Sequence, residues 1–425
     1  MNKTLPVKIN RPLHWFAVLT AVATFLLLGA GGLVTSHGAG MSVPDWPNSY
    51  GYNMFLFPPS KWIGGIFYEH THRLWATVVG LMTTILMLWI YGKGSRVFMR
   101  WLGIILPVIG IASEIFLWVA SKSEIVANIA KKIISPHYPQ HRFDGILDIV
   151  IGLVFLGASF FWPRCERSPK WLVWLGIAAF LAVVTQGVLG GLRVDLINPQ
   201  LGIFHGILAQ AFFALVCAIA LFTSRFWLEL MAREKTDFVP RGLRSHVLYV
   251  TILIFLQLAL GATMRHQHAG LSISDFPLAH GKIWPDTSAA AIARYNAERM
   301  DVVAENPITA FQVILQMIHR LVALLIFLGV AAASGLAVKR LGKKDSLTKL
   351  AFFWLMLIIG QIGLGIETIW SNKAADIATA HVLVGALSLV TGVLWCLIAF
   401  GRRAPVVETE SPAIFGVQPS LAGGK

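Results

Sequence analysis

Apolar residues along this chain gather in long stretches separated by short polar breaks, instead of alternating with polar residues or following one helical face. Each stretch has about 20 residues, and an α-helix of that length crosses the roughly 30 Å hydrocarbon core of a bilayer. The first stretch follows basic residues, as a signal peptide does, but it is too long and has no convincing cleavage site, so we expect a retained helix. The pattern predicts ten transmembrane helices, at about 14–34, 68–91, 101–120, 146–162, 171–192, 202–223, 246–264, 311–338, 351–370 and 380–400.

The composition agrees with a chain whose solvent is the bilayer. Hydrophobic residues make up 56% of the 425 residues and charged residues only 13%, and the mean hydropathy is +0.68. Soluble domains of this size carry a larger charged share, so we predict an all-α integral membrane protein. The three cysteines show no metal-ligand spacing, and we expect no cysteine chemistry.

The net charge of +14 has a topological explanation. Most lysines and arginines flank predicted helices in one set of alternating loops, and loops rich in these residues stay on the cytoplasmic side. This distribution predicts a multi-pass protein of the cell's inner membrane with both termini in the cytoplasm. It argues against nucleic-acid binding, because no basic and aromatic surface module accompanies the charge. The segment 122–142 breaks the pattern, since it is basic and yet is placed outside.

An internal repeat divides the chain into two parallel halves. The repeat comprises three aligned pairs: 31–47 with 261–277, 69–74 with 316–321, and 186–190 with 361–365. We therefore predict two pseudo-symmetric four-helix bundles in tandem, with a helical hairpin inserted in the first. Asp45 and Asp275, which match in the first aligned pair, are predicted to shape turns through their side chains.

The predicted boundaries follow from the repeat and from composition. The first half covers residues 1–225 and contains the inserted hairpin at about 96–170, and the second half covers residues 240–403. Residues 404–425 lack periodic apolar positions, which is typical of a disordered tail. The polar segment 281–307 has the composition of an amphipathic helix that either caps the second half or docks an electron donor.

Each half carries one histidine near an external helix start and another early in its last helix. The pairs are His72 with His205 and His319 with His381. An imidazole inside a membrane helix is costly to leave unsatisfied, and two imidazoles on facing helices of a bundle hold a flat iron macrocycle from both sides. A single histidine at a helix end is more often interfacial, but repetition at matching positions favours two haem sites. The remaining histidines are interpreted as structural.

Four short motifs together carry a family resemblance. They are VPDWP at 43–47, EHTHR at 69–73, QGVLGGLRV at 186–194 with His205 beyond it, and MIHR at 317–320. In these motifs the chain resembles the haem A synthase family, whose members are membrane enzymes that oxidise a ring methyl of haem O to a formyl group, giving the haem A of terminal oxidases. Many members carry a cysteine pair at positions where this chain has Val43 and Ser49.

The resemblance implies a role for each half. His72 and His205 of the first half bind haem O as the substrate, which is oxidised by successive hydroxylations. His319 and His381 of the second half bind a haem b cofactor that delivers electrons. A second, weaker copy of the motif within the inserted hairpin makes His141 a rival of His72.

One position differs between the halves in its chemistry. Glu69 aligns with Gln316, which cannot ionise, so Glu69 is predicted to be catalytic, as a proton carrier or as a stabiliser of a cationic carbon next to the ring. The alternative is that Glu69 only satisfies amides at the helix start. Arg73 and Arg320 directly follow the ligand candidates and are predicted to pair with haem propionates, with an interfacial anchoring role as the alternative.

The implied partners are haem O, haem A, membrane lipid, haem O synthase, oxidase assembly factors and an electron donor, either a ferredoxin or a quinol. A homo-oligomer is left open. Two alternatives have the same helices: a di-haem cytochrome b that only carries electrons or oxidises a quinol, and a haem transporter or chaperone. Electron carriage predicts two permanent haems and tolerance of Glu69→Gln, whereas synthesis predicts one exchangeable haem and loss of formyl product.

Overall fold

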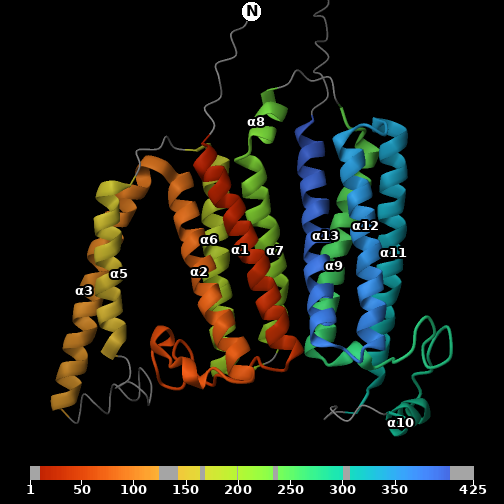
Figure 1. The fold of residues 1–425 in the computed structure, drawn as a ribbon, viewed down its shortest axis with the longest axis horizontal. Helices are drawn as coiled ribbons and strands as arrows, with labels where there is room; N and C mark the ends of the chain where they lie inside the picture. The colour runs from red at the N-terminus through yellow and green to blue at the C-terminus, as the bar shows by residue number, and fades with distance from the viewer. Residues whose placement is uncertain are drawn as a thin grey trace, which may run out of the picture.

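The computed structural model describes residues 10–123, 142–162, 168–198, 200–232, 238–299 and 307–402. Over these ranges the chain is helical, and its strand-like pairs are two isolated β-bridges. Short helices α8 (Arg225–Ala232) and α10 (Ala289–Ala297) and 3₁₀ turns join the longer ones. The long helices (Figure 1) are α1 Arg11–Ser36, α2 Gly65–Tyr91, α3 Ser95–Lys122, α5 Arg142–Phe161, α6 Lys170–Asp195, α7 Leu201–Phe222, α9 Arg241–His266, α11 Ala310–Leu341, α12 Ser346–Trp370 and α13 Ala375–Gly401.

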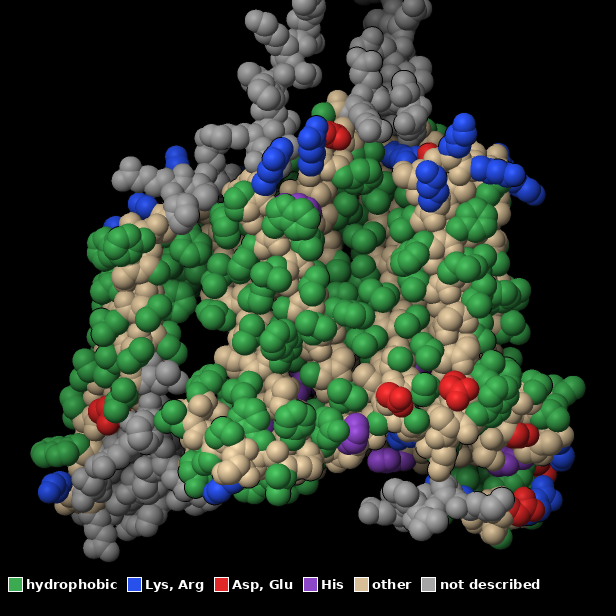
Figure 2. All heavy atoms as spheres, viewed as in Figure 1, with side chains coloured by type: hydrophobic (Ala, Val, Ile, Leu, Met, Phe, Trp, Pro, Cys, Tyr) green, Lys and Arg blue, Asp and Glu red, His purple; other side chains and the backbone are tan. Residues whose placement is uncertain are grey.

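These helices are those of a membrane protein. Eight segments of the described chain are long and apolar enough to span a bilayer, and one of them, Gly65–Phe116, runs through both α2 and α3. Helix α5 adds a shorter apolar stretch, Asp148–Phe161. Ten long helices therefore lie at the ten predicted positions, and the all-α membrane fold is confirmed, whereas the apolar stretch of α5 is shorter than the eight spanning segments. Apolar side chains cover the sides of the helices in Figure 2, as expected where lipid is the solvent.

The long helices form two four-helix bundles. In the first, α1, α2, α6 and α7 each pack against the next, and in the second α9, α11, α12 and α13 do the same. The bundles meet where α13 contacts α1 and α7, and where α7 contacts α9. They stand side by side in Figure 1 with their helices running in the same sense, which is the tandem arrangement that the sequence repeat predicted.

The inserted hairpin is a separate pair of helices beside the first bundle (Figure 1). Helices α3 and α5 pack closely along their length but have few contacts with α2. Glycines permit this approach: a Cβ built at Gly110 or Gly152 would collide with the backbone of Gly145 or the ring of Pro107. Arg96, near the start of α3, donates to the carbonyl of Trp162, which directly follows α5, and so links the two helices at that end.

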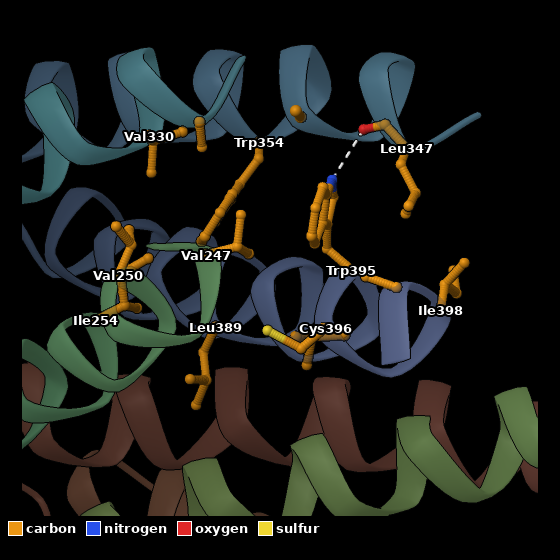
Figure 3. Packing of buried hydrophobic residues seen from close by; sticks show 14 of the residues in the cluster. Val247, Val250, Ile254, Val330, Leu347, Trp354, Leu389, Trp395, Cys396 and Ile398 are labelled. Carbon is orange, nitrogen blue, oxygen red and sulfur yellow. Dashed lines mark hydrogen bonds between the residues drawn. The ribbon is translucent and has the colours of Figure 1, made fainter. Parts of the chain in front are cut away.

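Buried tryptophans in the second bundle have their polar atoms satisfied. Trp354 and Trp395 are fully buried and lie among aliphatic side chains of the core (Figure 3). The Nε1 of Trp354 donates to the carbonyl of Ser388 at 2.8 Å, and the Nε1 of Trp395 donates to that of Leu347 at 2.9 Å. Because a buried N–H without a partner is costly, these bonds let large rings fill the bundle interior.

The two ends of the bundles differ in charge. Lysine and arginine gather at the end where α8 lies, and histidines appear near the opposite end (Figure 2). The predicted amphipathic helix in segment 281–307 is present as α10 at the histidine end. Some sequence-based predictions fall outside the described residues. They concern His141, Cys165, the tail 404–425 and most of the basic segment 122–142.

Candidate functional site

Two histidine pairs lie at the same end of the two bundles. His72 is in α2 and His205 in α7, and these helices stand diagonally across the first bundle. His319 in α11 and His381 in α13 occupy the same diagonal of the second bundle. The imidazoles of each pair lie within electrostatic range of each other. The fold therefore brings together the residues that the repeat paired.

One ring nitrogen of each of these histidines is buried without a partner. The Nδ1 atoms concerned make no hydrogen bond with the described residues, and they belong to His72, His205, His319 and His381. An unsatisfied buried polar atom costs about 1–3 kcal/mol and is uncommon. No cluster of three or more metal-ligating side chains occurs in the described ranges, so each pair suits a metal that brings its other ligands with it. Iron in a porphyrin, with imidazoles as axial ligands, fits this donor set.

A glycine of a neighbouring helix lies against each imidazole. A Cβ built at Gly31 of α1 would lie 3.0 Å from Cε1 of His72, and one built at Gly190 of α6 would lie 3.4 Å from Cε1 of His205. In the second bundle the corresponding distances are 3.5 Å from Gly261 to His319 and 3.2 Å from Gly365 to His381. We call these four the framing glycines, because the absence of a Cβ at each lets the imidazole of a ligand candidate lie directly against the neighbouring helix.

Glutamine side chains support three of the four histidines. The Nε2 of Gln186 donates to the carbonyl of His205 at 3.0 Å, and that of Gln257 donates to the carbonyl of His319 at 2.9 Å. The amide nitrogen of Gln361 lies 3.3 Å from Nε2 of His381. These roles were not predicted, and neither were those of the framing glycines. The signal was in the sequence, since the four glycines, Gln186 and Gln361 all lie in the repeated motifs.

The external loop that follows the first helix of each bundle has the same construction in both halves. The carboxylate of Asp45 accepts from the backbone N–H groups of Tyr50 and Gly51. The carboxylate of Asp275 accepts in the same way from His280 and Gly281. In both loops the peptide bond before the last proline of the aligned segment, Pro47 or Pro277, is cis. The predicted turn-shaping role of both aspartates is confirmed.

Glu69 and Gln316 occupy equivalent positions against these loops. The Oε2 of Glu69 accepts from the N–H of Val43 at 2.9 Å, and the Oε1 of Gln316 accepts from the N–H of Ile273 at 2.7 Å. Both residues are buried. Glu69 also forms an ion pair of 2.9 Å with Arg73, whereas the amide of Gln316 donates to two loop carbonyls.

The guanidinium groups of Arg73 and Arg320 hold the loops to the bundles. Arg73 donates to the carbonyls of Val43, Asp45 and Asn48 as well as to Glu69. Arg320 donates to the carbonyls of Asp275 and Leu278 and lies over the ring of Phe276. Their contacts therefore show loop anchoring, and the predicted pairing with propionates stays a prediction.

Other histidines have partners of a structural kind. His14 contacts the carbonyl of Ala220 and His246 that of Gly329, at the ends of the bundles away from the pairs. His280 stacks on Tyr295 of α10, with ring centroids 3.6 Å apart. The fully buried His70 lies beside Phe57 and Trp62, on the loop side of α2.

Comparison with known proteins agrees with this geometry. Residues 140–393 match the model of a family described as Cytochrome oxidase assembly protein. The haem A synthase of Shouchella clausii is 22% identical over 383 residues, which are 89% of this chain and 94% of that protein. The haem A synthase of Geobacillus kaustophilus is 22% identical over 95% of this chain and 97% of its own length. That of Methylobacterium sp. (strain 4-46) is 31% identical over 58% of this chain and 69% of its own length.

The matches run through both histidine-bearing bundles, and the family match extends from before α5 into α13. The family indicated by the sequence motifs is thereby confirmed. This chain belongs to the cytochrome oxidase assembly family that includes the haem A synthases.

Proposed function

We propose that this chain is a haem A synthase, which oxidises a ring methyl of haem O to a formyl group and so supplies haem A for terminal oxidases. The observation that carries the proposal is the pair of imidazoles in each bundle, with buried unpartnered nitrogens and a framing glycine beside each ring. The names of the relatives supply the reaction. Two iron porphyrin sites are what such a reaction needs, one for the substrate and one for electrons.

The two bundles take different roles. The first, within residues 1–225, receives haem O between His72 and His205. The second, within residues 240–403, holds haem b between His319 and His381, and this cofactor supplies single electrons when bound. The assignment is supported by Glu69, because the equivalent position of the second bundle carries a neutral amide.

Glu69 has the position of a catalytic group for the first bundle. It precedes His72 by three residues on α2, and residues with this spacing share one face of a helix. Its carboxylate is buried and held by Arg73 and the N–H of Val43, so its charge is fixed near the ligand. A fixed carboxylate stabilises positive charge that develops on a carbon next to the ring, or it accepts a proton released there.

The substrate carbon is oxidised in two stages. Each hydroxylation would use molecular oxygen as the oxidant: one oxygen atom enters a C–H bond, and the other leaves as water with electrons and protons from the donor side. The first converts the ring methyl to an alcohol, the second gives a gem-diol, and loss of water from the diol leaves the formyl group. The external loop with Asp45 and Trp46 lies over this end of the bundle and limits the access of water.

Charge distribution supports a topology for the protein. We propose that the end rich in lysine and arginine, opposite the histidine pairs, is cytoplasmic together with both termini, and that the haem sites lie near the outer face of the inner membrane. The tendency of basic loops to stay on the cytoplasmic side supports this orientation. We propose a ferredoxin or a quinol as the electron donor. We propose haem O synthase as the partner that delivers the substrate and oxidase assembly factors as the partners that receive the product.

The decisive experiment identifies the pigments that the chain makes. The full chain is expressed with a source of haem O, and the extracted haems are identified by mass and by pyridine spectrum. We expect a formyl-bearing haem from the wild type and none from His72→Ala, with the haem held by His319 and His381 still present in that variant. A wild type that is fully loaded with haem yet makes no formyl haem would contradict the proposal and favour an electron carrier.

A further inference from the structure

Two arginines and a lysine at the external end of the bundles form no ion pair with an acidic side chain of the described residues, although Glu69 lies within electrostatic range of Arg193. Arg193 at the end of α6 makes no hydrogen bond or ion pair with the described residues, and its Nε is buried. Arg265 at the end of α9 donates through Nη2 to Gly32 and Ser36 of α1, but its Nε is also buried without a partner. Lys373, in the turn between α12 and α13, forms no ion pair within the described chain. A positive charge that is partly removed from water without a counter-ion is costly, so each of these partly buried groups is a candidate to bind an anion.

Arg193 and Arg265 each lie about one helical turn after a framing glycine on the same helix. Arg193 follows Gly190 by three residues, and Arg265 follows Gly261 by four, so each arginine lies on the same helix face as a framing glycine. Both helices run toward the external end, which puts each arginine one turn nearer the surface than its glycine. A flat ring beside the glycine therefore meets the guanidinium at its outer edge.

Electrostatic proximity links each arginine to one histidine pair. Arg193 lies within electrostatic range of both His72 and His205 in the first bundle. Arg265 lies within range of His381 in the second. Burial lowers the pKa of Lys373, and the charge of Arg265 lowers it further.

The backbone makes room for Arg193. A Cβ built at Gly40 of the external loop would lie 2.5 Å from Nη2 of Arg193, so the guanidinium rests directly against the glycine backbone. At the aligned Gly270 nothing lies within 4 Å of such a Cβ. A guanidinium thus lies against the loop glycine in the first bundle, whereas the equivalent glycine of the second bundle faces open space.

We infer that Arg193 binds a propionate carboxylate of the haem in the first bundle, and that Arg265 binds a propionate of the haem in the second. This inference rests on the proposed function, because it takes haem as the ligand. A guanidinium matches a carboxylate in shape and charge, and a haem carries its two propionates on one edge. The guanidinium of Arg73 is engaged by its loop and by Glu69, and both terminal nitrogens of Arg320 donate to loop carbonyls.

Binding of a haem and its ester tests the inference. The full chain in detergent is titrated with iron protoporphyrin IX and with its dimethyl ester, in which both propionates are neutral. A His319→Ala background leaves the first site for measurement, and a His72→Ala background leaves the second. In both backgrounds we expect the free acid to bind roughly 10- to 100-fold more tightly than the ester, as for a hydrogen bond between charged groups.

Substitutions then assign the preference to a residue. In the His319→Ala background, Arg193→Gln should remove most of the preference for the acid and Arg193→Lys should keep part of it. Arg265→Gln should have the same effect only in the His72→Ala background. Arg244→Gln is the matched control, because Arg244 also has a buried, unpartnered Nε but lies at the opposite end of α9, and it should leave both preferences unchanged.

Each outcome decides between the possibilities. Equal affinity for the acid and the ester, when Arg193 and Arg265 are both present, overturns the inference and points to another anion, such as a lipid phosphate. Because this comparison needs no arginine variant, it decides the matter even if Arg193→Gln does not fold. A preference that persists in both glutamine variants overturns it as well. In each case histidine-dependent haem binding is retained and the proposed function stands. Absence of any binding that depends on His72 or His319 overturns both.

Discussion

The external ends of the two bundles share one backbone plan and differ in charge. In each, an aspartate closes the loop, an arginine holds it, and a buried side chain of the second helix accepts a loop N–H. That side chain is Glu69 in the first bundle and Gln316 in the second, and both make the same backbone contact. A neutral amide is therefore sufficient to anchor the loop, so anchoring does not explain why the first bundle has a carboxylate.

The packing of the loop on the bundle also differs between the halves. Trp46 lies so close to Gly191 of α6 that a Cβ there would collide with the indole. In the second half the aligned residues are Phe276 and Ile366, a smaller ring opposite a larger helix residue. The first bundle therefore has the larger ring against a glycine of α6. Duplication thus preserved the scaffold, and the chemical differences are confined to a few positions.

Removing one histidine from each pair separates the halves most strongly. We expect His319→Ala or His381→Ala to remove the resident haem from the purified protein. We expect His72→Ala or His205→Ala to retain that haem and abolish the formyl product. Loss of an axial ligand should weaken haem binding by at least about 100-fold, because changes in residues behind the ligands already cost up to that much. The Soret absorbance per mole of protein measures the first effect, and pigment analysis measures the second.

Equal loss of pigment from both pairs would contradict this division of roles. It is the result expected of a di-haem electron carrier, in which both haems are permanent. The two serine variants His14→Ser and His246→Ser serve as controls, because these histidines contact backbone carbonyls at the other end of the bundles.

Exchanging the two anchoring side chains tests what the carboxylate adds. Glu69→Gln should keep the bond from Val43 and the haem content, but it should lower the yield of formyl haem by about 100-fold, the lower range for loss of a general acid or base. The reverse change, Gln316→Glu, places a carboxylate against the carbonyls of Gly270 and Ile273 that the amide now donates to. We expect it to destabilise the protein by about 2–4 kcal/mol without any gain of activity.

Pigment analysis and thermal unfolding in detergent measure these two effects. Full activity of Glu69→Gln with normal haem content would show that the ion pair with Arg73 has no role in the chemistry. Double substitution to Glu69→Gln and Gln316→Glu should not restore formyl haem, because the two bundles hold different haems.

The sequence predicted the scaffold well because its signals are strong and local. Long apolar stretches marked all ten long helices, since about 20 apolar residues are needed to cross the bilayer whatever the tertiary contacts are. The repeat brought the histidine pairs and the loop aspartates into register, because both copies keep the same residues at the same spacing. The partners of each histidine could be read from this alignment without any knowledge of distances.

The repeat was a poor guide to residues that occur in one copy. Arg193 aligns with Thr368 and Arg265 with Thr35, so neither arginine stood out in the alignment. Arg73 and Arg320, which are repeated, drew the propionate assignment because they follow the ligand candidates directly. Their carbonyl partners lie 25 to 45 residues away in the chain, and such long-range contacts are not encoded in local spacing.

The framing glycines allow a comparison of smaller effects. An added Cβ would be 3.0 Å from the His72 ring in Gly31→Ala but 3.5 Å from the His319 ring in Gly261→Ala. We expect Gly31→Ala to displace the His72 imidazole and lower haem affinity of the first bundle by about tenfold, equivalent to about 1.4 kcal/mol. Gly261→Ala should leave the second haem in place and stabilise its helix by up to about 1 kcal/mol. Haem titration and thermal unfolding measure both, and equal effects on the two haems would contradict the difference in clearance.

The smallest predicted effect distinguishes Gly40 from Gly270. Gly40→Ala forces the guanidinium of Arg193 to move, whereas Gly270→Ala enters open space. Neither glycine has a positive φ, so alanine fits the backbone at both positions and the comparison isolates the side-chain collision. We expect Gly40→Ala to reduce the first site's preference for haem over its dimethyl ester by about threefold, less than 1 kcal/mol, and Gly270→Ala to leave both sites unchanged. If both alanines act alike, the guanidinium does not need its place against Gly40, and that contact has no part in holding the substrate.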